Sequence, residues 1–323
     1  MKLAPYSRIL ARGQGRSRSF TQEEAREAMR IILDGEGDPE AIGAILTLLR
    51  MKGEVAEEIA GFAEAARETL PQIPRPALDW PSYAAGRTRG LPFFLLSARL
   101  VASGGHKVLI HGWNSEHHMQ AAASVRGALP LVGIPMAGSV EEAGELLEAQ
   151  GIAYLPLEAF QPALLDLLRL RDKLGVRSCV NTVLRVLNPA KAPASVQGVF
   201  HPPYRELQAD AGKLLGQQSL TVIKGGGGEF ERNPTKATAL FGLRDGAAFD
   251  GSASEILPET QKLNQGWESQ ARLAQLWSGE WQDDFAEAVV LGTAALALDT
   301  LGVAEPEDEA RRLWQVREVT APV

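Results

Sequence analysis

The sequence predicts an α/β protein in which a small all-helical N-terminal domain precedes a large α/β domain with a mainly parallel central sheet covered by helices. Two observations support this fold class. Helical patterns fill residues 20–70, whereas beyond residue 80 short apolar runs alternate with helical segments. Such alternation is typical of a parallel sheet with crossover helices. We therefore expect a helical domain over residues 1–75 and an α/β domain over residues 76–323.

The N-terminal domain is expected to begin with a basic, loosely ordered stretch and to continue with three helices. Thr21 and Glu24 have the spacing of a capping box at the start of the first helix. Asp38 followed by Pro39 opens the second helix, whose apolar residues recur at the i, i+3, i+4, i+7 spacing. The third helix covers about residues 55–70. The linker that follows is marked by Pro71, Pro74, Pro76 and Pro81.

The larger domain is expected to alternate strands with helices. Apolar runs predict strands over residues 108–111, 153–155, 196–200 and 220–223. Helical patterns cover residues 140–149, 162–173, 203–215, 285–301 and 306–314, and residues 235–280 have little periodicity. Ligands of such sheets bind beyond the carboxyl ends of the strands. The loops after Ile110 and Ile223 are therefore the candidate site.

Composition limits the class of protein and its surroundings. A net charge of −7 over 323 residues argues against uniform coating by nucleic acid, which needs accessible cations. Cys179 is the single cysteine, which excludes an internal disulfide and fits a reducing compartment. The apolar run 286–301 is too short to span a bilayer and no secretory signal is recognisable. We expect a cytoplasmic protein without membrane contact.

The segment KGGGGEFERNP at residues 224–234 is the most informative stretch of the chain. It follows a predicted strand, and its glycines permit positive φ and close backbone approach to a ligand. Lys224 and Arg232 supply cations, and Glu229 and Glu231 supply carboxylates. The segment is neither a P-loop nor a dinucleotide fingerprint. It is either a phosphate-binding loop or a bend at the surface. Its glycines are Gly225, Gly226, Gly227 and Gly228.

Other candidate residues precede and follow the predicted strand at 108–111. Arg87 and Arg89 in GRTRG either bind phosphate or are solvated loop charges. Lys107 either joins them or only begins the strand. His111 is expected in the cleft, and Trp113 either stacks on a nucleobase or covers the site. The neighbouring histidines lack the spacing and the cysteine partners of a zinc site.

Three segments resemble anthranilate phosphoribosyltransferase and its nucleoside-phosphorylase relatives, which form glycosyltransferase family 3. They are SFTQEEAREAMRIILDGEGDPEAIGAILTLLRMKGEVAEEIAGFAEAARE from Ser19, LGVRSCVNTVLRVLNPA at 174–190 and VQGVFHPPYRELQADAGKLLG at 196–216. The resemblance implies that the helical domain, completed by a helix near 175–190, mediates homodimerisation. It also implies a phosphoribosyl-diphosphate and metal site between the domains. Arg177 matches the arginine that binds the aromatic acid, and it is either a ligand contact or a structural cap.

The catalytic motifs of that family are altered in this sequence. AAGRTRGLPFFLLS stands where the diphosphate loop GTGGD is expected, and IHGWNS at 110–115 stands for KHGNR. Asn114 and Ser115 are possible ligand contacts within the second motif. The metal-binding Asp-Glu pair falls on Phe230 and Glu231, with Glu229 as a displaced carboxylate. The two glutamates are either metal ligands or partners of Arg232 and Lys236. A phenylalanine cannot enter the oxygen cage that Mg²⁺ requires.

A paralogous branch associated with nucleic-acid binding, the YbiB type, carries KGGxGE…RNP in place of the metal motif, and this sequence resembles it. We therefore predict a phosphoribosyltransferase-like protein with degenerate catalytic motifs that binds DNA or RNA through a basic cleft, and for this function the sequence indicates no certain cofactor. The alternative is a Mg²⁺-dependent glycosyl (pentosyl or phosphoribosyl) transferase that uses a phosphorylated ribose donor, with Glu229 and Glu231 as metal ligands. The predicted phosphate or nucleic-acid contacts are Arg87, Arg89, Lys107, His111, Trp113, Lys224, Gly225, Gly226, Gly227, Gly228 and Arg232.

Overall fold

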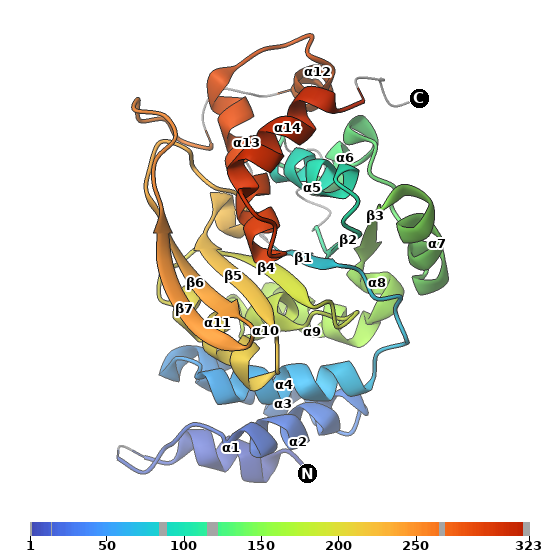
Figure 1. Cartoon of the computed structure of the whole chain (residues 1–323). Helices are drawn as coiled ribbons and strands as arrows, with labels where there is room; N and C mark the ends of the chain where they lie inside the picture. The colour runs from blue at the N-terminus through green and yellow to red at the C-terminus, as the bar shows by residue number, and fades with distance from the viewer. Residues whose placement is uncertain (1, 14, 84–88, 115–121, 265–268, 319–323) are drawn as a thin grey trace.

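The computed structural model describes residues 2–13, 15–83, 89–114, 122–264 and 269–318. In Figure 1 a layer of N-terminal helices lies below an α/β domain, as the sequence predicts. Within the described residues the α/β domain contains a seven-stranded, mainly parallel sheet with helices on both faces. The predicted fold class is confirmed.

The helical domain contains α1 (Ala4–Ala11), α2 (Gln22–Leu33), α3 (Pro39–Lys52) and α4 (Ala56–Glu68). Helix α1 corrects the expectation of a loosely ordered start, because Leu3 and Leu10 are buried in the core of this domain. The capping box of α2 is present. Thr21 Oγ1 accepts from the Glu24 backbone N at 3.2 Å, and the Thr21 backbone N donates to Glu24 Oε2 at 2.9 Å. Asp38 holds the N-cap position of α3 without a side-chain capping bond.

Replacing Glu24 by Gln tests this cap. Hydrogen bonds from Arg18 lower the pKa of Glu24 from 4.5 to about 2. Since folding depresses this pKa, the stabilisation is complete above pH 4.5 and is lost as the pH falls through 2. We expect Glu24→Gln to lower the free energy of unfolding by about 1 kcal/mol at pH 7 and by clearly less at pH 3. Urea unfolding at both pH values measures this, and an equal loss at pH 3 would contradict it.

The sheet has the strand order β3-β2-β1-β4-β5-β6-β7. Neighbours from β3 to β5 pair in parallel, and β6 and β7 add an antiparallel hairpin to the β5 edge. The strands expected near 108, 153, 196 and 220 are confirmed as β2, β3, β4 and β5. The bounds are β1 Leu78–Ser82, β2 Val108–Gly112, β3 Ile152–Pro156, β4 Ala194–Val199, β5 Ser219–Lys224, β6 Thr238–Arg244 and β7 Ala247–Ala253.

The sequence analysis missed β1, although this strand lies in the middle of the sheet. It assigned Pro81 to a linker, yet Pro81 lies within β1. β1 pairs with β4 only at Leu78 and Asp79, so Pro81 lies beyond the end of that ladder, where its missing N–H removes no hydrogen bond to β4. The hairpin of β6 and β7 was missed as well. Asp245 and Gly246 join these strands with φ of 50° and 74°, which an Asp-Gly turn favours.

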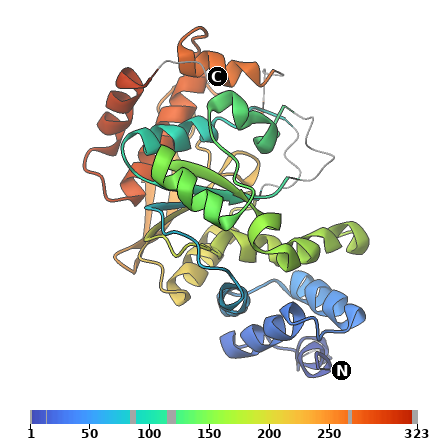
Figure 2. The ribbon, with the colours of Figure 1, turned by 90° about the vertical axis from the view of Figure 1, so that its right-hand side faces the viewer.

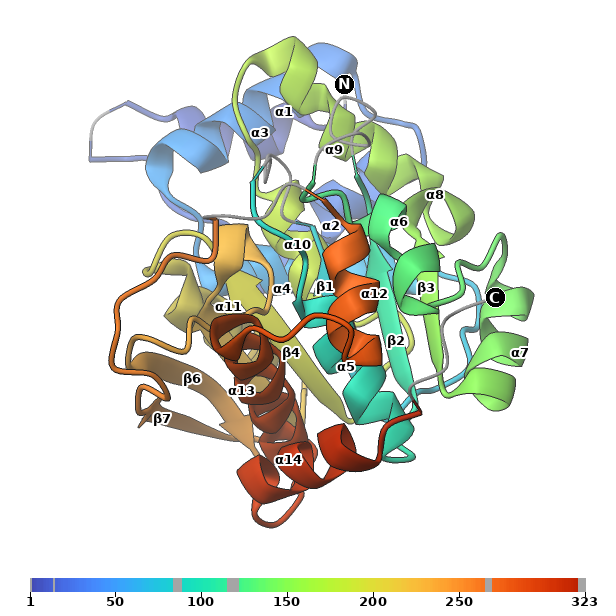
Figure 3. The same ribbon diagram turned by 90° about the horizontal axis from the view of Figure 1, so that it is seen from above.

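Helices cover both faces of the sheet. α13 (Asp284–Thr300) and α5 (Phe94–Ser103) pack together over one face, where α13 contacts β4 and β5 and α5 contacts β2 and β3. Seen from above, α13 and α14 (Pro306–Val316) lie on the side of the sheet away from the N-terminal helices (Figure 3). On the other face α11 (Tyr204–Leu214) contacts β5 and β6, and α4 packs on α10 (Val180–Val186) and α11. The same layering appears in the side view, with the N-terminal helices at the bottom (Figure 2).

The expected helices of the α/β domain are confirmed, and the structure adds α5 and α12 together with short turns. α10 lies within residues 175–190, where the family resemblance implies a helix. Within the described residues, no helix is both long and apolar enough to cross a membrane. The bounds are α5 Phe94–Ser103, α6 Val125–Ala128, η2 Pro130–Val132, α7 Val140–Gln150, α8 Leu157–Phe160, α9 Pro162–Leu174, α10 Val180–Val186, α11 Tyr204–Leu214, η3 Gly226–Gly228, α12 Ala271–Ser278, α13 Asp284–Thr300 and α14 Pro306–Val316.

Candidate functional site

The glycine loop, residues 225–228, turns the chain back on itself at the carboxyl end of β5. A Cβ on Gly225 would lie 1.7 Å from the Glu229 carbonyl oxygen, and one on Gly226 would lie 2.5 Å from Glu231 Oε1. Gly227 and Gly228 have φ of 66° and 95°, which favour glycine. The loop's own fold therefore requires each of its glycines, whether or not a ligand binds.

The carboxylates after the loop bind protein groups. Glu231 is fully buried, and its Oε2 accepts from the backbone N of Phe94 at 3.0 Å. Phe94 begins α5, where the helix dipole favours a negative charge. Glu229 is 2% exposed, and its Oε1 accepts from Ser82 Oγ at 3.1 Å. Glu231 therefore anchors α5 to the loop.

Phe230, which lies between Glu229 and Glu231 in the sequence, belongs to the hydrophobic core. Its side chain is fully buried and meets Trp80 edge to face, with ring centroids 5.5 Å apart. Across the described ranges, no group of three or more His, Cys, Asp or Glu side chains is placed to hold a metal ion. Since Mg²⁺ requires an oxygen cage, the residues around Glu229 and Glu231 do not fit it.

An arginine-lined cavity lies beside Gly227 where the helical and α/β domains meet. We call it the arginine groove, and its volume is about 70 Å³. It lies at the carboxyl ends of β4 and β5, the edge where ligands of such sheets bind. The side chains and loop that define it are Arg50, Arg177, Arg185, His201, Tyr204 and Gly227.

The arginines of this groove come from separate parts of the chain. Arg50 lies on α3, and its Nη1 donates to Tyr204 Oη at 2.9 Å. Arg185 lies on α10 and is 8% exposed, with Nη2 donating to the Tyr83 carbonyl at 3.2 Å. Burial lowers the pKa of Arg185 to about 10, so it stays cationic at neutral pH. Burial and the nearby Arg171 and Arg50 lower the pKa of Arg177. The groove is therefore positively charged.

An exposed aromatic side chain borders the same groove. Phe200 follows β4, and 55% of its surface is exposed. It contacts His201 edge to face, with ring centroids 4.8 Å apart. A large exposed apolar side chain beside several cations can stack on a base while the cations hold phosphates.

The structure brings only part of the predicted site together. Arg177 and Gly227 line the groove, and Lys224 is exposed at the end of β5, next to the glycine loop. Arg89 is exposed. Trp113 and Asn114 are partly buried, and Trp113 packs against the core of the helical side. Arg87 and Ser115 lie outside the described residues.

Two predicted phosphate contacts lie elsewhere, which corrects the predicted basic cleft. Lys107 precedes β2 and so lies at the amino end of the sheet, where its Nζ pairs with Glu148 at 2.5 Å. Arg232 is 3% exposed, and its side chain lines a different groove, beside α13 and α14. Sequence proximity to the glycine loop does not fix the face on which a side chain emerges.

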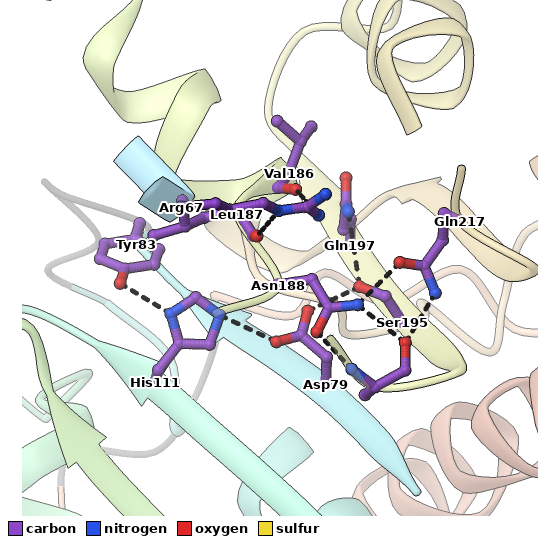
Figure 4. Close-up of polar contacts among 11 residues, drawn as sticks. Arg67, Asp79, Tyr83, His111, Val186, Leu187, Asn188, Ser195, Gln197 and Gln217 are labelled. Carbon is purple, nitrogen blue, oxygen red and sulfur yellow. Dashed lines mark hydrogen bonds and ion pairs between the residues drawn. The ribbon is translucent and has the colours of Figure 1, made fainter. Parts of the chain in front are cut away.

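His111 is fully buried, which corrects its predicted place as a ligand contact. Figure 4 shows it between Tyr83 and Asp79. Its Nδ1 lies 2.8 Å from Tyr83 Oη, and its Nε2 lies 3.1 Å from Asp79 Oδ1, close enough for an ion pair but not aligned as a hydrogen bond. Asp79 Oδ2 accepts from Ser195 Oγ at 2.7 Å. This polar network ties β1, β2 and β4 together.

A separate set of polar contacts lies beside this network and reaches the helical domain. Arg67 on α4 donates from Nε to the Leu187 carbonyl at 2.7 Å, after the end of α10 (Figure 4). Asn188 Nδ2 donates to Gln217 Oε1 at 2.7 Å, joining the start of β4 to the start of β5. The Arg67 contact holds α4 of the helical domain against the end of α10.

Arg50, Arg185, Phe200 and His201 were missed by the sequence analysis. Arg185 carried a usable signal, since it lies within the apolar helix VNTVLRV and had to be either buried or at an internal surface. Arg50 had none, because one basic residue near the end of a helix is ordinary.

A helical domain packed on a mixed seven-stranded sheet, with a charged groove at their junction, defines the class of this protein. The chain belongs to glycosyl transferase family 3, because the family's helical bundle domain matches residues 6–70 and its a/b domain matches residues 94–314. This confirms the resemblance found in the sequence.

Individual proteins similar to this chain support the same family assignment. The chain is 30% identical to an anthranilate phosphoribosyltransferase of Geobacillus stearothermophilus over 87% of this chain and 81% of that protein. The anthranilate phosphoribosyltransferase of Thermus thermophilus is 31% identical, with 85% and 84% covered. A crystal structure of the Thermus thermophilus enzyme superimposes with a TM-score of 0.80 at 25% identity, covering 99% and 95%. The yeast enzyme in complex with PRPP and Mg shares the fold, with a TM-score of 0.74 at 18% identity over 97% and 92%.

Proposed function

We propose that this protein uses the phosphoribosyltransferase fold to bind nucleic acid at the arginine groove and does not transfer phosphoribosyl groups. The observation that supports this most strongly is the convergence of Arg50, Arg177 and Arg185 beside Gly227. The planar guanidinium of arginine can donate two parallel hydrogen bonds to the oxygens of one phosphate. Bringing these cations together costs electrostatic energy, and a bound phosphate backbone would offset that cost.

The surroundings of the groove favour a strand of nucleic acid over a small phosphate. Phe200 offers a stacking surface at the border, and Lys224 extends the positive charge past the glycine loop. Base stacking on an exposed aromatic side chain is worth about 1–3 kcal/mol per base. The match to KGGxGE…RNP in the YbiB-type branch supports the same function.

The metal position also argues for binding without transfer. Phosphoribosyl transfer needs a cation to stabilise the departing diphosphate. In this chain the expected aspartate is the core residue Phe230, and Glu231 caps α5. Within the described residues the groove is therefore suited to binding phosphate through arginines alone.

Fluorescence anisotropy with labelled 20-nucleotide DNA and RNA single strands tests the proposal. We expect saturable binding at low salt that is unchanged by EDTA. Absence of saturable binding to either strand, at protein concentrations up to about 100 μM, where non-specific nucleic-acid binding is ordinarily detected, would disprove it.

Phe200→Ala separates strand binding from simple charge attraction. We expect the single-strand dissociation constant to rise by about 5- to 100-fold, the loss of one stacked base, and duplex affinity to change little. Phe200 is exposed, so the variant should fold normally. Equal effects on single-stranded and duplex DNA would show that Phe200 does not stack on a base.

The competing function is phosphoribosyl transfer. It is favoured by the relatives that are about 30% identical to this chain, because these proteins are anthranilate phosphoribosyltransferases. Titration calorimetry with phosphoribosyl diphosphate distinguishes the two functions. Micromolar binding that requires Mg²⁺ and disappears in Glu231→Gln would support the transferase. The absence of a binding heat with phosphoribosyl diphosphate, together with binding of single-stranded nucleic acid, would support the nucleic-acid function.

A further inference from the structure

A second groove, of about 680 Å³, is lined by the end of β7, the segment after it and the helices α13 and α14. We call it the Arg232 groove. It is separate from the arginine groove, which is lined by other residues at the junction with the helical domain. The side chains that give it its chemistry include Arg232, Ile256, Glu287, Leu291, Ala295 and Glu307.

Arg232 is the unusual residue of this groove. Its side chain is 3% exposed, yet throughout the described part of the chain no carboxylate lies within ion-pair distance of it, and the charge of Glu307 acts on it only from farther away. Nη2 donates to the Ser254 carbonyl, whereas Nε is buried without any hydrogen-bond partner. A buried guanidinium with so few acceptors is strongly unfavourable unless an anion joins it.

The surrounding fold is shaped around this side chain. The Arg232 backbone N donates to Thr293 Oγ1 of α13 at 2.9 Å, which fixes the chain against the helix. Gly292 on the same helix makes room for it, because a Cβ there would lie 2.8 Å from Ile256 Cδ1 and 3.3 Å from Arg232 Cδ. A glycine inside a helix costs about 1 kcal/mol relative to alanine, so this space comes at the expense of helix stability.

The rest of the groove determines which anion fits. Its border carries the carboxylates Glu255, Asp284, Glu287 and Glu307. Arg311 is also present, but it is paired with Asp308 at 2.6 Å. Carboxylates around one buried cation repel a polyanion such as nucleic acid or diphosphate and attract an ammonium group. Ile256, Leu291 and Ala295 supply apolar surface between the two charges.

We propose that the Arg232 groove binds a small zwitterion with the chemistry of an apolar α-amino acid. The ligand carboxylate pairs with the Arg232 guanidinium, which supplies the missing acceptors. The ligand ammonium lies among the border carboxylates, of which Glu287 on the first turn of α13 is the most buried. The apolar side chain rests on Leu291 and Ile256.

Titration calorimetry on the full chain tests this with L-leucine, L-phenylalanine and two matched probes. 4-Methylpentanoate is L-leucine without the ammonium group, and 3-methylbutylamine is L-leucine without the carboxylate. We expect at least one of the two amino acids to bind saturably. For L-leucine, removal of either charge should weaken binding by about 10- to 100-fold, the value of one charge-assisted contact. Failure of both amino acids to bind, or equal binding of 4-methylpentanoate and L-leucine, would overturn the proposal.

Arg232→Met supplies the decisive control, because methionine keeps the linear shape without the charge. We expect it to abolish amino-acid binding, to leave single-strand binding at the arginine groove unchanged, and to leave the ligand-free thermal midpoint unchanged or higher. Glu287→Gln should weaken the binding of L-leucine but not the binding of 4-methylpentanoate, which has no ammonium group. A lower thermal midpoint in Arg232→Met would mean that the fold already satisfies Arg232, and the proposal would be wrong.

Discussion

Phe230→Asp is expected to lower the free energy of unfolding by more than about 3 kcal/mol and to create no Mg²⁺ site. The family resemblance implies an aspartate here, but the Phe230 side chain is fully buried and packs edge-on against Trp80. The substitution removes that contact and buries a carboxylate among apolar side chains. Urea unfolding with and without MgCl₂ measures both effects.

Phe230→Leu is the matched control for this variant. It keeps the position apolar and should cost about 1–2 kcal/mol. The interpretation of Phe230 as a core residue would fail if Phe230→Asp were nearly as stable as Phe230→Leu. It would fail equally if Mg²⁺ raised the stability of Phe230→Asp, because the metal site would then be intact apart from one ligand.

Arg50→Gln combined with Arg177→Gln is expected to weaken single-strand binding by about 100-fold or more at low salt, through the loss of two charge-assisted phosphate contacts that are each worth about 10-fold or more. Both side chains line the arginine groove at the surface, so the variant should fold. Anisotropy titration of the labelled strand measures the change.

Arg312→Gln controls for the loss of positive charge in general. Arg312 is exposed on α14, on the face of the sheet away from the helical domain, and pairs with Glu309 at 2.6 Å. We expect no change in affinity for the single strand. A comparable loss in Arg312→Gln would show that binding follows net charge and not the groove.

The fold was largely predictable because its elements carry local signals. Apolar runs marked β2 and β5, and the Thr21 capping box marked the start of α2. β1 escaped because Asp79 and Pro81 interrupt its apolar pattern. Asp79 is buried there because Ser195 donates to it and His111 lies beside it, which are contacts that appear only in the folded protein.

The site was predictable only where one segment builds it. The glycine loop was recognised as a turn at a strand end, and its glycines are explained by contacts within the loop itself. The groove beside it needs Arg50 from α3 and Arg185 from α10, which the sequence separates widely. Arg232 was misplaced for the opposite reason, because neighbours along the chain can face different grooves.

The salt dependence of single-strand binding tests the central claim most directly. If arginines neutralise backbone phosphates, the logarithm of the association constant falls linearly with the logarithm of salt concentration, with a slope of about −0.7 per phosphate neutralised. We predict that Arg50→Gln with Arg177→Gln makes this slope shallower by about 1.4, while Arg312→Gln leaves it unchanged. Binding that is absent or insensitive to salt, or an identical slope in the double variant, would contradict the assignment of the arginine groove as the nucleic-acid site.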